Sequence, residues 1–437
     1  MEKNPFTYGD PISHPGRFFG RQREIEQVFS RLCNPEFESS SLVGERRIGK
    51  TSLLNYLADP EVRRSHGLNP DRYLFVYIDL QLVGKSSTPI QLWHWLLQQI
   101  ARQYQDAEIV EILKNLTTSN TIDNFALEEL FARLDGKDKY IVFLLDEFEN
   151  VTDNQNFDPG FFFAMRSLAI RHKLALVTSS QRELIELCHS EAIRASPFFN
   201  IFANINLRLF KEDEARKLIT TSLQNSGVSF TEKEITMILR LAGCHPFFLQ
   251  AACYFLYEAY AHNLSVDERK KYLMKEFFEE ASPHLDDYWR NSSDSEKIVL
   301  TVLALLERQG KASGHSFNIA QLRSLYARSD QTLLHLEKRS MLAAKNSSYA
   351  LFNSVLGDWI VAEITNTLND QQNYEEWLKS NKGLLDRISV KFKNEVGEIL
   401  PKVGSKYREL FINWLSDPRI LVVAADLLRG ALVSFHV

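Results

Sequence analysis

The chain has 437 residues, enough for about two to four domains, and its 44% apolar and 24% charged residues are ordinary for a globular protein, which excludes a mainly disordered or fibrous chain. The formal net charge of −5 gives no whole-protein attraction to nucleic acid or to an anionic membrane, so any such binding must be local. The four cysteines are scattered without a C-x-x-C pair, which suggests neither a zinc site nor a disulfide framework, and we expect free thiols in a reducing cytoplasm.

The N-terminal residues lack the apolar core of a secretory signal, and no stretch reaches the ~18–20 apolar residues of a spanning helix. The most apolar stretch, residues 420–437, contains Asp426 and Arg429. We interpret it as a buried amphipathic helix, with a membrane-touching tail as the alternative. We therefore expect a cytoplasmic protein that does not use a membrane.

Five short apolar runs alternate with helical patterns in the first part of the chain, an order typical of a parallel sheet with crossover helices. The second, third and fourth runs are continuously apolar, which indicates that both faces of the sheet are covered. We predict an α/β sandwich with a five-stranded parallel sheet, whose strands are residues 40–43, 73–78, 140–145, 174–177 and 199–205.

The strand signals stop near residue 209, and helical patterns follow, including the capping-box sequence Thr231-Glu-Lys-Glu234. Residues 291–365 have the pattern of a winged helix: helices at 295–308, 319–328 and 330–339, then a hairpin that turns at Asn346. A polar hinge at 366–373 precedes the final helices. The predicted domains are an N-terminal linker (1–21), the α/β domain (22–209), a helical domain (210–290), a winged-helix domain (291–365) and a C-terminal helical module (371–437).

The strongest motif lies between the first predicted strand and a helix expected at 51–58, and it has the complete G-x-x-x-x-G-K-[ST] spacing of a phosphate-binding loop. Its glycines let the backbone wrap closely, and its N–H groups receive the β-phosphate. The lysine reaches the β and γ oxygens, and the threonine hydroxyl takes Mg²⁺. We therefore predict a P-loop NTPase. The expected nucleotide contacts are Gly44, Glu45, Arg46, Arg47, Ile48, Gly49, Lys50, Thr51 and Ser52.

A second motif, Tyr140-Ile-Val-Phe-Leu-Leu-Asp146-Glu147, ends an apolar strand in two carboxylates and resembles a Walker B motif. Because parallel strands present their carboxyl ends at one edge of the sheet, we expect Asp146 beside the phosphate loop, where it holds Mg²⁺ together with Thr51. Glu147 is placed to orient or deprotonate an attacking water, and it is a predicted catalytic residue together with Lys50. Alone, a strand that ends in Asp-Glu is more often a solvated turn, but the upstream phosphate loop favours the metal site.

The fourth predicted strand is followed by Thr178-Ser-Ser-Gln-Arg182. The Ser179 hydroxyl or the Arg182 guanidinium would reach the γ-phosphate from this neighbouring strand, the latter as a catalytic group. Equally, Ser180 would cap a helix over 181–188. One segment can do both, so both interpretations stay open.

Together these motifs resemble the AAA+/STAND group of signal-transduction ATPases, in the bacterial and archaeal branch that carries a winged helix after the ATPase domain. The segment Arg17-Phe-Phe-Gly-Arg-Gln-Arg-Glu24 is similar to the family's h-h-G-R-x-x-E linker, which lies against the adenine. The resemblance thus implies nucleotide contacts from Phe19, Gly20 and Arg21. The alternative is an apolar staple before a helix at 22–32.

The segment Gly243-Cys-His-Pro246 looks like the family's G-x-P motif of the helical lid, shifted by one residue. In that family the proline approaches the base, so the resemblance implies a nucleotide contact from Pro246, and His245 could additionally contact a phosphate. The local alternative is a helix C-cap followed by a proline in the first turn of the next helix, and the two interpretations are compatible.

The resemblance implies ATP/ADP and Mg²⁺ as cofactors and slow ATP hydrolysis. The sequence departs from the family's pattern at two places, and these limit what the resemblance implies. Ring-forming relatives carry an arginine finger before the last strand, where this chain has Arg194 and Pro197, so a fast ring motor is not expected. The predicted winged helix also lacks the Met-His-Asp triplet that binds ADP in some relatives.

From the resemblance we expect a STAND-type switch whose ATP binding controls self-association or recruitment of a protein partner, in bacterial stress or antiviral defence signalling. The alternative is a DNA-binding AAA+ ATPase that resembles origin-recognition or transposition loaders. Residues 331–339, the candidate recognition helix, are mostly apolar, and the predicted winged helix has only a small excess of basic residues. DNA contact is therefore the weaker expectation. The C-terminal module reads as an adaptor or self-association bundle, or as an extension of the core.

Overall fold

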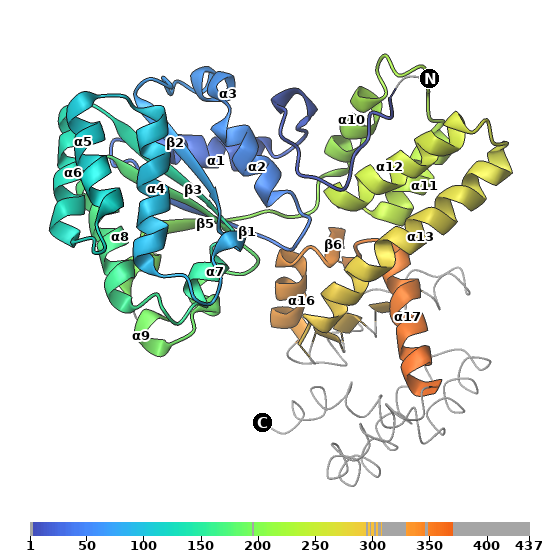
Figure 1. The fold of residues 1–437 in the computed structure, drawn as a ribbon. Helices are drawn as coiled ribbons and strands as arrows, with labels where there is room; N and C mark the ends of the chain where they lie inside the picture. Colours follow the sequence, from blue (N-terminus) through green and yellow to red (C-terminus); the bar gives the residue numbers. More distant parts are fainter. Residues whose placement is uncertain are drawn as a thin grey trace, which may run out of the picture. The chain divides into compact units, whose positions relative to one another are not determined.

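The structure is a computed structural model that describes residues 3–194, 196–293, 329–345 and 348–369, together with 296, 297, 299, 300, 303, 304 and 307. The chain divides into two compact units. The sheet unit is Thr7–Gln224, and the helical unit consists of residues 3–6 with the described residues from Asn225 onward. Figure 1 shows the elements of both units. No helix in the described ranges is long and apolar enough to cross a membrane.

The five predicted strands are present as β1 (Ser39–Val43), β2 (Tyr73–Asp79), β3 (Tyr140–Asp146), β4 (Leu174–Ser180) and β5 (Phe202–Asn206). They form one parallel sheet with the order β2-β3-β4-β1-β5, which confirms the predicted fold class. Strand β4 is longer than predicted because its pairing with β1 continues through the polar residues 178–180. Strand β5 begins later than predicted because Pro197 starts a 3-10 helix, η4 (Pro197–Ile201).

Successive residues of the central strands face opposite sides of the sheet and enter two separate cores. Phe143 packs in one core and Leu144 in the other, as expected for a sheet covered on both faces. Helices α1 (Gln22–Leu32), α2 (Lys50–Ala58) and α3 (Pro60–Ser65) cover the Leu144 face. The Phe143 face is covered mainly by α4 (Pro89–Gln103), α5 (Ala107–Thr118), α6 (Asn124–Gly136) and α8 (Pro159–Arg171) (Figure 1).

Side-chain caps explain where several of these helices begin. The carboxylates of Asp106, Asp123 and Asp158 accept backbone N–H bonds in the first turns of α5, α6 and α8. Helix α1 has the predicted bounds, and α2 begins one residue earlier than predicted. The remaining elements of the sheet unit are η1 (Pro15–Arg17), η2 (Leu80–Leu82), α7 (Glu149–Thr152), η3 (Leu184–Leu187), α9 (Glu191–Arg194) and α10 (Glu212–Ser222).

The helical unit contains α11 (Glu232–Ala242), α12 (Pro246–Ala261) and α13 (Val266–Arg290). Helix α12 packs against both α11 and α13. The capping box predicted at Thr231 is present: Thr231 Oγ1 accepts the N–H of Glu234, and Glu234 Oε2 accepts the N–H of Thr231 at 2.8 Å.

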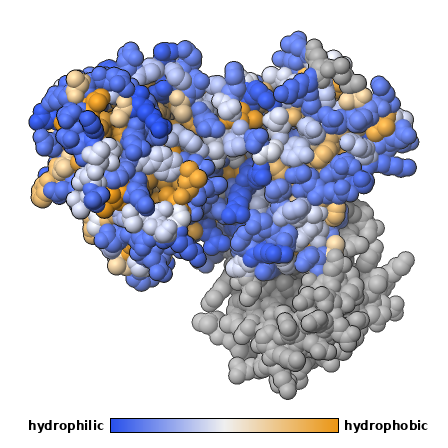
Figure 2. All heavy atoms as spheres, viewed as in Figure 1, coloured by the Kyte–Doolittle hydropathy of each residue, from blue (hydrophilic) through white to orange (hydrophobic). Residues whose placement is uncertain are grey.

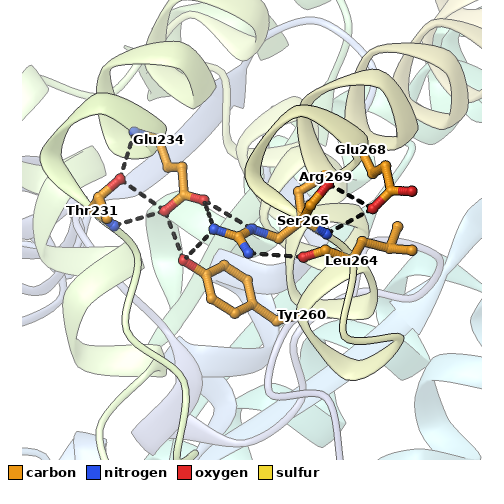
Figure 3. A network of polar contacts seen from close by, with 7 residues as sticks. All are labelled: Thr231, Glu234, Tyr260, Leu264, Ser265, Glu268 and Arg269. Atoms are coloured by element: carbon orange, nitrogen blue, oxygen red, sulfur yellow. Dashed lines mark hydrogen bonds and ion pairs between the residues drawn. The ribbon is translucent and has the colours of Figure 1, made fainter.

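Glu234 also forms the centre of a polar network that joins the three helices (Figure 3). Arg269 of α13 donates from Nε and Nη2 to Glu234 Oε1 at 3.2 and 3.1 Å, and the Tyr260 hydroxyl of α12 donates to Oε2 at 2.8 Å. The guanidinium lies 4.1 Å from the centre of the Tyr260 ring. Burial alone would raise the pKa of Glu234, but the hydrogen bonds from Thr231, Tyr260 and Arg269 lower it. The carboxylate therefore stays charged and paired.

Beyond α13, the described elements are α16 (Ser329–Lys338), β6 (Leu342–Lys345), β7 (Ser348–Leu351) and α17 (Ser354–Asn369). Strands β6 and β7 form the predicted antiparallel hairpin. Its turn at Asn346, the helix predicted at 319–328 and much of that at 295–308 lie outside the described residues, so the winged helix stays a prediction. Helix α17 continues to Asn369 and so occupies the first residues of the predicted hinge. The C-terminal module at 371–437 also lies outside the described residues.

A buried ion pair connects α16 with the residues that follow α13. Arg339 Nη1 donates to Glu296 Oε1 at 2.8 Å and to Ser292 Oγ at 3.2 Å, and His335 Nδ1 lies 2.9 Å from the same carboxylate oxygen. Burial alone would raise the pKa of Glu296, but the His335 hydrogen bond and the Arg339 charge lower it to about 2. Glu296 is therefore an anion that depends on these partners.

The surface is mainly hydrophilic on the face shown in Figure 2. The most exposed large apolar side chain of the sheet unit is Phe125 at the start of α6, which is 81% exposed, and Leu82 in η2 is 73% exposed. Isolated residues of this kind are ordinary on protein surfaces. They do not by themselves mark a docking site.

Candidate nucleotide-binding site

The predicted phosphate loop connects the buried strand β1 directly to α2, which begins at Lys50. Gly49 has a φ of 99°, a left-handed conformation that glycine adopts without strain. A Cβ on Gly44 would lie 2.9 Å from the carbonyl oxygen of Leu207, so only glycine fits there. The two glycines thus bring the loop onto the N-terminus of α2, where backbone N–H groups favour an anion.

The Lys50 side chain lies within the loop and is only 4% exposed. Its Nζ donates to the carbonyl oxygens of Gly44 at 2.9 Å and Glu45 at 3.3 Å, and the Glu45 carbonyl also accepts the N–H of Ile48. The carbonyls of the loop that is predicted to bind the phosphates thus hold the ammonium.

Some side chains of this loop and of the start of α2 are exposed to solvent, and some bind the N-terminal segment. Arg46 and Arg47 are exposed, and Arg47 donates to the carbonyl of Gly9 at 2.8 Å. Ser52 Oγ accepts the N–H of Ile12 at 3.0 Å, so Ser52 fastens the N-terminal segment to α2. Thr51, the predicted Mg²⁺ ligand, is partly buried in the first turn of α2.

Asp146 ends strand β3, as predicted, and is buried. Its Oδ1 accepts a hydrogen bond from the Ser179 hydroxyl, and its Oδ2 accepts one from the Tyr77 hydroxyl at 3.1 Å. These donors come from the neighbouring strands β4 and β2 and fix the orientation of the carboxylate. Tyr77 was not predictable from local sequence, because its role depends on the pairing of β2 with β3.

Glu147 has a φ of 53°, in the left-handed region, which costs a non-glycine residue about 1–2 kcal/mol. The turn is held by hydrogen bonds: the N–H of Glu147 donates to Ser179 Oγ at 3.1 Å and to Asp146 Oδ1 at 3.2 Å, and the N–H of Phe148 donates to the Ser179 carbonyl at 2.8 Å. Strain of this kind is characteristic of functional sites. It turns the predicted catalytic carboxylate away from the strand direction directly after Asp146.

Ser179 and Arg182, both predicted to contact the γ-phosphate, occupy different environments. Ser179 is fully buried and its hydroxyl is used by Asp146, whereas Arg182 is exposed beyond the end of β4. The alternative helix over 181–188 with Ser180 as its N-cap is wrong. Ser180 is the last residue of β4 and its hydroxyl donates to the Arg182 carbonyl at 2.6 Å, so a 3-10 helix, η3, begins only at Leu184.

Glu149 is a further carboxylate of this site that the sequence reasoning missed. Burial raises its pKa to about 7, repulsion from Glu147 adds to the increase, and the positive charge of Lys50 opposes it. Its Oε1 accepts the N–H of Gln181 at 3.1 Å, and its buried Oε2 finds no hydrogen-bond partner among the described residues. The available signal was the Asp-Glu-x-Glu spacing at 146–149.

The linker motif forms a left-handed turn before α1, in which Gly20 and Arg21 have φ values of 70° and 65°. Arg21 was predicted to contact the nucleotide, yet its side chain is 4% exposed and directed into the protein. Its Nη1 donates to the Arg208 carbonyl at 2.6 Å and its Nη2 to the Ile48 carbonyl at 2.9 Å. Contacts of Gly20 and the partly buried Phe19 with a nucleotide stay predictions.

The predicted lid motif has the expected local geometry in the helical unit: Gly243 ends α11 with a φ of 61°, and Pro246 is the first residue of α12. His245 is fully buried, with its Nε2 3.1 Å from the Tyr288 hydroxyl and its ring centre 5.7 Å from that of Phe352. The structure therefore gives His245 a packing role, and a phosphate contact would require it to leave this cluster.

The comparisons with known proteins agree with this site. The model of a family described as Novel STAND NTPase 2 matches residues 33–306, more than half of the chain. The chain belongs to this family. The matched range contains the phosphate loop, Asp146 with Glu147, and the Gly243–Pro246 motif. Membership in the Novel STAND NTPase 2 family confirms the resemblance to STAND ATPases and identifies the chain as a nucleotide-binding P-loop NTPase.

Two solved structures share the fold. The Walker-type ATPase of Pyrococcus abyssi has a TM-score of 0.53 and 15% identity, over 81% of this chain and 99% of that chain. The ORC2 protein of Aeropyrum pernix, in its ADPNP–ADP complexes, has a TM-score of 0.52 and 14% identity, over 83% of this chain and 99% of that chain. At such identities the likeness concerns the fold alone. No curated protein matches the chain.

The donor set suits Mg²⁺ bound together with a nucleotide. Among the described residues, no group of three or more His, Cys, Asp and Glu side chains would hold a metal on its own. Mg²⁺ at nucleotide sites typically takes one or two protein oxygens and completes its shell with phosphates and water. The buried, oriented Asp146 carboxylate and the Thr51 hydroxyl fit that requirement.

Proposed function

We propose that this STAND NTPase binds Mg·ATP and hydrolyses it slowly. The N–H groups of the phosphate loop would bind the β-phosphate, and Lys50 would exchange the Gly44 and Glu45 carbonyls for phosphate oxygens. Thr51 and Asp146 would hold Mg²⁺, which supplies positive charge to the phosphate oxygens when bound.

Hydrolysis would depend on Glu147, whose carboxylate would orient the attacking water and accept its proton. The left-handed turn at Glu147 supports this role, because the Ser179 contact fixes the backbone of Glu147 relative to Asp146. Arg182, at the end of the adjacent strand, would contact the γ-phosphate.

The first test is ATP turnover in Glu147→Gln, with Glu186→Gln as the control because Glu186 is an exposed carboxylate on η3. The amide keeps the shape and loses the proton acceptor, so turnover should fall about 10²–10⁴-fold while Mg·ATP binding persists. The control should behave like the wild type. Undiminished turnover in Glu147→Gln would remove this residue from the mechanism.

We further propose that the nucleotide state sets a molecular switch. One observation carries this proposal: the lid motif, which contacts the base in the resembling family, packs tightly against the segment that follows the hairpin. A Cβ on Gly243 would lie 2.0 Å from the Phe352 carbonyl oxygen, and the His245 ring lies among those of Phe248, Tyr288 and Phe352. A nucleotide that moved Pro246 would therefore disturb Phe352 and the elements around it.

In this proposal ATP favours an open arrangement that exposes a surface for self-association or for a protein partner, and ADP favours the closed one. A nucleotide that binds the open form about 10⁴-fold more tightly would move a 1:99 population to 99:1. The role in bacterial stress or antiviral defence signalling is proposed from the family resemblance.

Mass photometry with ADP, ATP and a non-hydrolysable ATP analogue tests the switch, with and without a DNA duplex. ATP-dependent oligomers without DNA would support it. Assembly that requires DNA, with an affinity that falls steeply as salt rises, would support the DNA-binding alternative instead. An unchanged mass under all conditions, together with no capture of a partner in the ATP state, would refute the switch.

A further inference from the structure

The Arg21 guanidinium connects two stretches of backbone that are far apart in the sequence. Its Nη2 donates to the carbonyl of Ile48, inside the phosphate loop, and its Nη1 donates to the carbonyl of Arg208, after the last strand of the sheet. The planar fork of a guanidinium suits this task, since it presents donors in fixed directions to two acceptors at once.

The segment after Arg208 contacts Arg21 and its neighbour in two further ways. The Phe210 ring lies 4.8 Å from the guanidinium and so close to Gly20 that a Cβ there would lie 3.0 Å from it. The backbone N–H of Arg21 donates to Glu214 Oε1 at 3.2 Å, while Glu214 Oε2 accepts the N–H of Lys211, the residue before α10, at 2.9 Å. The start of α10 is thus fastened to the linker turn.

The charge of Arg21 makes these contacts interdependent. Burial lowers its pKa to about 10, so the side chain is a cation at neutral pH, and its carboxylate partner Glu24 lies 3.7 Å away. A buried cation is costly unless its donors stay satisfied. If the Ile48 carbonyl moves, the guanidinium must shift with it to keep its donor bonded, and that shift weakens its hydrogen bond to the Arg208 carbonyl. A movement of the Arg208 carbonyl weakens the bond to Ile48 in the same way.

We propose that Arg21 is a positioning residue that holds the phosphate loop in shape and transmits its conformation to residues 208–214 and the start of α10. This differs from the role implied by the family resemblance, in which the linker motif lies against the base. The proposal rests on nucleotide binding by the loop, but not on hydrolysis or on the switch.

Nucleotide binding would act on this connection through Lys50. When the ammonium leaves the carbonyls of Gly44 and Glu45 for phosphate oxygens, the loop that contains Ile48 readjusts. Arg21 would carry that change to α10, which is the last helix of the sheet unit before the unit boundary after Gln224. The nucleotide site would thereby communicate with the chain that leads into the helical unit.

The test compares Arg21→Met and Arg21→Lys with the control Arg23→Met, which removes an exposed arginine two residues away, in the first turn of α1. Amide hydrogen exchange without nucleotide comes first. Arg21→Met should exchange faster than the control in both 44–51 and 208–214, and Arg21→Lys should be intermediate because an ammonium lacks the fork. Unchanged exchange in either segment of Arg21→Met would overturn the proposal, whether or not the chain binds ADP.

The second arm adds saturating ADP. In the wild type and the control, ADP should slow exchange in both segments. In Arg21→Met it should slow exchange in 44–51 only, and the Kd for ADP should rise about tenfold, as for the loss of one hydrogen bond to a charged group. ADP-dependent protection of 208–214 that persists in Arg21→Met would overturn the coupling and leave a structural role.

The preference of the protein for ADP over GDP distinguishes a positioning role of Arg21 from a direct contact of Arg21 with the base. Loss of the preference for ADP over GDP in Arg21→Met, with protection of 208–214 retained, would assign Arg21 to the base instead. Absence of any ADP binding in the wild type would refute the proposed function, and the nucleotide-free arm would still decide whether Arg21 connects the two segments.

Discussion

Substitution of Gly243 by alanine should separate the lid motif from the Phe352 segment. The added Cβ would lie 2.0 Å from the Phe352 carbonyl oxygen, so that backbone must move by roughly 1 Å to reach an ordinary contact. Alanine at a φ of 61° and a ψ of −150°, a conformation nearly confined to glycine, costs a further ~1–3 kcal/mol. Gly227→Ala is the matched control, because Gly227 has a φ of 70° and no neighbouring atom within 4 Å of a Cβ.

Both variants place alanine at a positive φ, and only Gly243→Ala adds a collision with neighbouring backbone. Displacing the buried Phe352 side chain forfeits part of the ~1.5–3 kcal/mol that its burial contributes. We expect Gly243→Ala to be about 2 kcal/mol less stable than Gly227→Ala, a further Tm decrease of ~4–8 °C for a unit of this size. Calorimetry would measure this difference.

The functional assay is sedimentation without ATP. If the packing at Gly243 keeps the chain closed, Gly243→Ala should self-associate without ATP while its affinity for ADP at the phosphate loop is retained, and Gly227→Ala should not. Equal melting temperatures and equal masses for the two variants would show that the contact between Gly243 and Phe352 does not keep the chain closed.

Three further substitutions test the polar groups. Lys50→Ala should abolish nucleotide binding in calorimetry, yet lower the stability of the nucleotide-free protein by only ~1–2 kcal/mol, because Lys50 makes two hydrogen bonds to loop carbonyls; unchanged ATP affinity would end the P-loop assignment. The pKa of Glu149 is raised to about 7, so its protonated form stabilises the fold below the ordinary carboxyl pKa, and this contribution is lost as pH rises through about 7. Glu149→Gln should thus be more stable than the wild type at pH 8, by on the order of 1–3 kcal/mol in urea unfolding, with the difference shrinking toward pH 5; a difference independent of pH would contradict the burial argument. Arg339→Met should cost about 3–5 kcal/mol in thermal unfolding because it leaves Glu296 buried without its cation, and the added change Glu296→Gln should recover part of the loss.

The sequence predicted the parts of the molecule that depend on local pattern. The strands followed from short apolar runs that alternate with helical patterns, and the phosphate loop followed from spacing that the backbone itself requires. The groups that orient the site were not predictable in this way. Arg21 meets Ile48 and Arg208, and Tyr77 meets Asp146, only because the fold brings distant segments together.

The error at residues 181–188 has the same origin. Ser180 is a good N-cap residue by local preference, but pairing of β4 with β1 extends the strand through it and delays the next helical turn to Leu184. The additional phosphate contact of His245 stays a prediction, whereas the aromatic packing around it is a property of the folded helical unit.

The proposed switch responds to ATP occupancy rather than to hydrolysis. Its most direct test is phosphate release and sedimentation measured on the same sample of Glu147→Gln at saturating Mg·ATP. We expect slowed hydrolysis together with a larger oligomeric fraction than the wild type, because the variant stays in the ATP state. Slowed hydrolysis with a mass that stays the same as in ADP would contradict it.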